Sequence, residues 1–95
     1  MTVGVLRITL RLPSRSLKEK RAIVRPIVER LRSRFNAAVA EVDALDAAGS
    51  AVIAAAVLSN DARHADEQLA AIAAAVQEWR PDAELLDLET ELLDA

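Results

Sequence analysis

Hydrophobic and polar residues alternate at both ends of the chain. From Thr2 to Leu12, even-numbered leucine and isoleucine residues oppose a side that carries Arg7 and Arg11. Glu84 to Leu92 alternates in the same way, with leucines opposed to acids. Strict alternation is typical of a strand with one buried face, so the pattern predicts a first and a last strand. The acids of the last strand are Asp87, Glu89 and Glu91.

Apolar residues recur at helical spacing in two longer segments. Ser16 followed by Glu19 forms a capping box, and an apolar stripe then continues to about Phe35. Pro26 lacks a backbone donor, so we expect a bend or an irregular turn there. The second helix begins after Ser59-Asn60-Asp61 and stops before Pro81. The first stripe is Leu17, Val24, Val28, Leu31 and Phe35, and the second is Ala62, Ala65, Leu69, Ile72, Val76 and Trp79.

Two alanine-rich segments of strand length, 37–45 and 51–58, lie between the helices and are separated by the turn-like 46–50. The predicted order is therefore βαββαβ in one domain, residues 1–95. Two right-handed crossovers then give a ferredoxin-like α+β fold, with a four-stranded antiparallel sheet in the order 4-1-3-2 and both helices on one face. On the open face, Arg7 and Arg11 could meet the acids of the last strand.

Charge is distributed unevenly along the chain. Ten of the twelve basic residues but only two of the fifteen acids, Glu19 and Glu29, lie within the first 35 positions, and the net charge is −3. Such asymmetry indicates either charge matching within the fold or a basic surface that meets a polyanion.

Six short segments, spread in order along nearly the whole chain, resemble the YlxP-like family of small bacterial proteins, which carry domain of unknown function 503. The resemblance implies a ferredoxin-like domain without an established biochemical role or catalytic residues. Genes of that family often lie near those for translation initiation and ribosome maturation factors. In the Ala44–Ser50 turn, relatives often have a longer or more aromatic connection. The segments are residues 3–8, 16–21, 34–36, 40–43, 59–65 and 85–91.

The first helix carries the strongest candidate for a nucleic-acid interface. At 100° per residue, one flank of the apolar stripe is basic, and the opposite flank holds Lys20, Arg30 and Arg34. We expect phosphate contacts along the first flank, and hence association with RNA or a ribonucleoprotein. The alternative is a solvated helix whose cations face acids elsewhere in the fold or in a partner subunit. The candidate contacts are Arg15, Lys18, Arg21, Arg25 and Arg32.

The start of this helix also offers an anion site. Ser14, Arg15, Ser16 and Lys18 surround free backbone N–H groups, which favour phosphate or sulfate. The segment lacks the glycines of a phosphate-binding loop, and a simple N-cap at Ser16 explains it equally well.

Ser59, Asn60, Asp61 and His64 bring a hydroxyl, an amide, a carboxylate and an imidazole within six residues. This suggests a ligand or enzymatic site at a subunit interface, against which stands capping by Asp61 with a surface histidine. The topology places Lys18 and His64 at opposite ends of the sheet. It also places Arg32 or Arg34 near Asp61, so a contact between them is expected.

Composition narrows the remaining possibilities. The chain has no cysteine and one histidine, and we expect no metal and no cofactor. We expect a cytoplasmic protein without a membrane span. Phe35 and Trp79 fall on apolar stripes, so core packing is favoured over base stacking. The run from Leu69 to Val76 is apolar all round its helix, which predicts a homo-oligomer, most simply a dimer that uses this helix or the open sheet.

Overall fold

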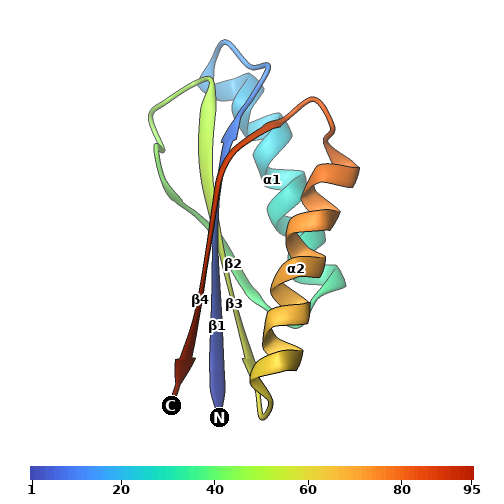
Figure 1. The fold of residues 1–95 in the computed structure, drawn as a ribbon. Coiled ribbons are helices and arrows are strands. Elements are labelled where there is room, and N and C mark those ends of the chain that lie inside the picture. Colours follow the sequence, from blue (N-terminus) through green and yellow to red (C-terminus); the bar gives the residue numbers. More distant parts are fainter.

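Six elements follow one another in the predicted order in the computed structural model, which describes residues 1–95. The sheet is antiparallel throughout, and its order β2-β3-β1-β4 is the predicted order read in reverse. Both helices cover one face (Figure 1). The ferredoxin-like prediction is therefore confirmed. The elements are β1 (Thr2–Arg11), α1 (Leu17–Arg34), β2 (Ala38–Asp43), β3 (Ser50–Ser59), α2 (Ala62–Trp79) and β4 (Glu84–Asp94).

Both helices begin at the predicted caps. The Ser16 hydroxyl accepts the Glu19 N–H at 3.1 Å, and the Asp61 carboxylate accepts the Arg63 N–H at 3.0 Å. The α1 helix continues through Pro26, so no irregular turn interrupts it. Proline removes one helical hydrogen bond, but Pro26 and the residue four positions before it are exposed, where water can satisfy the freed carbonyl. Neither helix is long and apolar enough to cross a membrane.

The core lies between the helices and the three strands β1, β2 and β3. Alternate residues of β1 are buried on the helix side, as the sequence predicts. Gly4 lies on this side, where an added Cβ would stand 3.0 Å from Val57 Cγ2 and 3.2 Å from Leu69 Cδ1. Glycine therefore lets α2 approach the sheet closely. Phe35 and Trp79 pack at the margin of this core, as predicted.

The helices cover the sheet unequally. The α1 helix packs on β2 and β3, whereas α2 packs mainly on β1 and β3. All eleven residues of β4 are exposed. As Figure 1 shows, α1 begins at the end of the sheet that carries the β2–β3 loop, and α2 begins at the opposite end, beside the termini. The starts of the two helices thus lie far apart, as the predicted topology requires.

Candidate nucleic-acid interface

Three of the predicted contact residues share one hollow between α1 and β2. Arg21, Arg25 and Arg32 line this hollow of about 360 Å³. Positions i, i+4 and i+11 of a helix lie on one flank, which explains why the three guanidinium groups gather there. Two carboxylates, those of Glu29 and Glu41, also line the hollow. Arg15 and Lys18 do not line it, because they lie at and before the first turn of α1.

The predicted contact residues are exposed and unpaired. No ion pair of 4.0 Å or less involves any of them. Three other cations of the first 35 positions, Arg7, Arg11 and Lys20, do pair with acids beyond position 35, so the charge asymmetry cancels only in part. The unpaired set is Arg15, Lys18, Arg21, Arg25 and Arg32.

Arg32 is held by the neighbouring strand. Its Nε and Nη2 donate to the carbonyl oxygen of Val39 in β2, at 2.9 and 2.6 Å. The expected contact of Arg32 or Arg34 with Asp61 is therefore wrong: no hydrogen bond or ion pair joins them, and Asp61 caps α2. The Val39 carbonyl lies on an edge strand and needs a donor, which Arg32 supplies. Nη1 of Arg32 keeps both of its protons free of protein acceptors.

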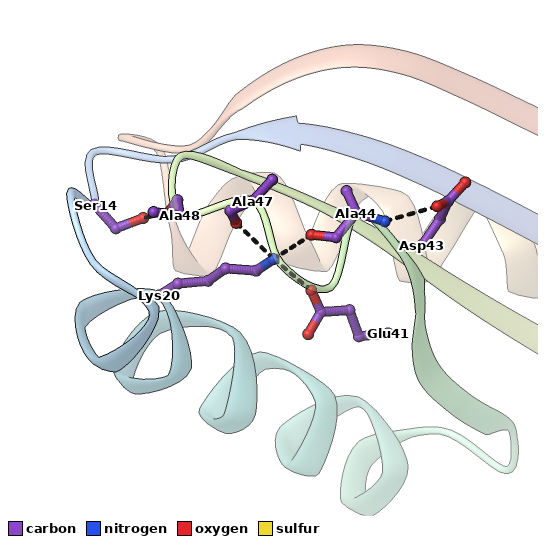
Figure 2. Close-up of polar contacts among 7 residues, drawn as sticks. All are labelled: Ser14, Lys20, Glu41, Asp43, Ala44, Ala47 and Ala48. Atoms are coloured by element: carbon purple, nitrogen blue, oxygen red, sulfur yellow. Dashed lines mark hydrogen bonds and ion pairs between the residues drawn. The ribbon is translucent and has the colours of Figure 1, made fainter.

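Lys20 does not belong to an exposed basic flank, and that prediction is wrong. Its side chain is 3% exposed, and Nζ donates to the carbonyl oxygens of Ala44 at 2.7 Å and Ala47 at 2.8 Å. Glu41 Oε2 lies 2.8 Å from the same nitrogen. Figure 2 shows the ammonium group held among these three oxygens. Two hydrogen bonds and one ion pair hold the ammonium group, so Lys20 is a structural anchor for the β2–β3 loop.

The β2–β3 loop that Lys20 holds also accepts a hydrogen bond from Ser14. Ala44 has the one positive φ of a non-glycine residue, 55°, and its N–H donates to Asp43 Oδ1 at 2.7 Å. The Ser14 hydroxyl is buried and donates to the carbonyl oxygen of Ala48 at 2.6 Å (Figure 2). Because the Ser16 hydroxyl caps α1, both serines of the expected anion site have structural partners. Only the cations of that site remain free.

The cations outside the hollow have varied surroundings. The guanidinium of Arg30 stacks on the Trp79 ring, with its carbon 4.2 Å from the ring centroid.

On the open sheet face, Arg11 pairs with Glu84 of β4 at 3.3 Å. Arg7 instead pairs with Asp43 of β2 at 3.0 Å. It reaches across β3 because the residue beside it there, Ala54, is small. The acids expected to meet these arginines, Asp87, Glu89 and Glu91, make no ion pair.

The second candidate site serves the start of α2. The Ser59 hydroxyl accepts the Asp61 N–H at 3.1 Å, and the Asp61 carboxylate caps the helix. Asn60, Asp61 and His64 border a polar hollow with Arg63 and Glu67, whereas Ser59 does not line it. No hydrogen bond joins Ser59 to His64, so the two side chains do not form a nucleophile–base pair within one chain.

Comparison with known proteins assigns this chain to a family. Residues 3–90 match the family described as "Protein of unknown function (DUF503)". The chain belongs to the DUF503 family. The family predicted from the six sequence segments is thus confirmed, and the description of this family assigns no activity. No curated protein matches it.

Two solved structures resemble the DUF503 chain in fold. The de novo designed protein LFR1 1 with ferredoxin fold has a TM-score of 0.58 and 14% identity, over 100% of this chain and 87% of that one. The de novo designed protein Foldit4 has a TM-score of 0.56 and 14% identity, over 99% and 97%. At this identity the likeness shows the fold alone, so function has to be argued from the surface of the DUF503 chain itself.

Proposed function

We propose that this protein is a non-enzymatic cytoplasmic accessory domain that binds the phosphate backbone of RNA or a ribonucleoprotein. The contact surface is the exposed flank of α1, centred on the hollow that Arg21, Arg25 and Arg32 line. Arg15 and Lys18 extend this surface toward the start of the helix. The observation that carries the proposal is that all five side chains are exposed and free of ion pairs.

The geometry of Arg32 supports this proposal. Its hydrogen bonds to Val39 fix the guanidinium at the rim of the hollow, so binding costs less side-chain entropy than for a free arginine. Glu29 and Glu41 border the same hollow, which lowers its net positive charge and favours a directed contact over indiscriminate binding. The acids of β4 lie at the other edge of the sheet, away from this flank.

The charge of the hollow is tested by the double variant Arg21→Gln and Arg25→Gln. Arg32 is left intact because it also bonds β2. We expect weaker binding to a single-stranded RNA oligonucleotide, and a slope of log affinity against log salt that is shallower by roughly 1.4 for two lost phosphate contacts. Fluorescence anisotropy at several salt concentrations measures both quantities.

A matched control removes the same amount of charge elsewhere. The double variant Arg34→Gln and Arg63→Gln changes two exposed arginines outside the hollow. It should bind RNA nearly as tightly as the parent protein. Equal weakening by the two double variants would show that only net charge matters, and RNA affinity unchanged by Arg21→Gln and Arg25→Gln would refute the proposal.

Self-assembly is a second candidate, and the open sheet face favours it. A shallow hollow there is lined only by hydrophobic residues, among them Val5, Val42, Ala54 and Ala56. A homodimer formed through this face would leave both α1 helices free. Ala56→Asp should then lower the mass found by sedimentation equilibrium from dimer to monomer, and a parent protein of monomer mass at all concentrations would contradict self-assembly.

A further inference from the structure

The last strand presents two chemically distinct rows of side chains, and all residues of both rows are exposed. Leu88, Thr90 and Leu92 face the helix side, since they lie opposite the buried or inward positions of β1. Leu88 is 43% and Leu92 42% exposed. Asp87, Glu89 and Glu91 occupy the open face and are also exposed. We call this strand with its two rows the β4 edge.

The backbone of the β4 edge is unpaired on its outer side. The Ala95 N–H donates to the Met1 carbonyl oxygen at 2.8 Å, which places the backbone groups of residue 95 toward β1. In an antiparallel ladder these directions alternate, and the register is regular from Thr2 to Thr9. The N–H and C=O groups of Leu88, Thr90 and Leu92 therefore point outward. Together they form a row of free donors and acceptors onto which another strand can pair.

The acidic row is not neutralised within the fold. The register places Glu89 opposite Arg7, but the guanidinium of Arg7 pairs with Asp43 of β2 instead. Neither Asp87 nor Glu91 makes an ion pair. A strand that adds to this edge would thus set its own open-face side chains beside three free carboxylates.

A second copy of this chain does not fit the edge. If two β4 strands paired with their leucine rows on the same side, the acidic rows would also lie side by side. Like charges opposite one another destabilise a strand pair. The chemistry that matches both rows is a segment in which lysine or arginine alternates with an apolar residue.

From this match we propose that the β4 edge binds an extended segment of a partner protein by β-strand addition. Its cations lie beside Asp87, Glu89 and Glu91, and its apolar residues pack on Leu88 and Leu92. The β4 edge and the basic flank of α1 lie at opposite edges of the sheet, so peptide binding at β4 does not depend on RNA binding.

The experiment uses the full chain and a capped heptapeptide that alternates lysine and valine. Titration followed by amide NMR should shift the signals of Leu88, Thr90 and Leu92. A peptide of the same composition, with its valines in one block and its lysines in the other, should bind at least tenfold more weakly. Equal binding of the two peptides would overturn the proposal, since charge alone would then explain it.

Two variants at one position separate strand pairing from side-chain contact. Thr90→Pro removes an outward N–H while leaving the bonds to β1, and edge strands tolerate proline at such positions. Thr90→Val keeps the N–H and the shape. We expect roughly tenfold weaker peptide binding for the proline variant and little change for the valine variant. Equal affinities would refute strand addition.

A third measurement does not depend on a proline variant that folds. Replacing Glu89 and Glu91 by glutamine should weaken binding of the alternating peptide, whereas Glu67→Gln with Glu78→Gln, at exposed positions of α2, should not. Peptide-induced shifts confined to α1 or to the open-face hollow in the parent protein would overturn the assignment to the β4 edge.

Discussion

The two edges of this sheet are protected in different ways. At one edge, β2 has six residues, a register irregularity between Glu41 and Asp43, and a carbonyl that Arg32 of α1 covers. At the other edge, β4 has eleven residues, all exposed, with a register shift only near its start and three acids without an ion pair on its open face. Short strands, bulges and covering side chains close an edge, whereas charge only restricts what can pair with it.

The two edges therefore differ in what they can bind. The closed edge holds a cation in a fixed position beside the basic hollow, and the exposed edge leaves hydrogen-bonding groups for a partner. Two neighbouring cations of α1 also differ in exposure. Lys20 is buried and donates to carbonyl oxygens of the β2–β3 loop, whereas Arg21 is exposed to solvent. Charge counted along the sequence does not distinguish such residues, but burial does.

The largest expected effect comes from removing the Lys20 ammonium group, which anchors the β2–β3 loop beside the closed edge. Lys20→Met would leave the Glu41 carboxylate without its cation and two carbonyl oxygens without their donor. We expect the free energy of unfolding to fall by about 3 kcal/mol, as for a buried ion pair that loses one partner. Urea denaturation measures the change.

Lys18 supplies the matched control for this anchor, because it is exposed and unpaired on the same turn of the helix. Lys18→Met should alter stability by less than about 0.5 kcal/mol. Equal effects of the two substitutions would show that the contacts of Lys20 do not stabilise the fold.

Two leucines that face each other across β1 and β4 compare the covered sheet with the exposed edge. Leu10 is fully buried, and its partner Leu85 is 38% exposed. Leu10→Ala should destabilise the protein by roughly 2.5 kcal/mol through lost burial and a cavity. Leu85→Ala should cost less than about 1 kcal/mol, since it already contacts water. Comparable losses in thermal or chemical unfolding would mean that β4 is covered in solution.

A smaller effect is expected where Arg32 covers the β2 edge. Arg32→Lys keeps the charge but cannot present two donors in one plane to the Val39 carbonyl. We expect a loss of about 1 kcal/mol in unfolding free energy. Arg25→Lys, at an arginine without such bonds, serves as the reference, and a loss as large at Arg25 would remove the structural role given to Arg32.

The fold could be predicted from the sequence because its signals are local. Alternation identified β1 and β4, and the caps Ser16 and Asp61 fixed both helix starts. The buried position of Lys20 also had a signal, since it precedes Val24, Ile27 and Leu31 by 4, 7 and 11 residues, along the buried stripe. A flank defined by charge type concealed that spacing.

The partners of these side chains could not be predicted, because they depend on contacts between distant segments. Arg7 passes its register neighbour Glu89 and reaches Asp43, which requires the small side chain of Ala54 between them. The leucines of β4 alternate as a buried face would, yet α2 packs mainly on β1 and β3. Helix placement above a sheet, and not periodicity, decides whether such a row is buried.

The most direct test of the account maps RNA onto the arginine side chains themselves. In a spectrum of the arginine Nε–Hε groups, titration with a single-stranded RNA oligonucleotide should shift the signals of Arg21, Arg25 and Arg32 at low salt. The signals of Arg63 and Arg80 should stay in place. Shifts at those two arginines instead, or no shift at any arginine at low salt, would contradict the proposed contact surface on α1.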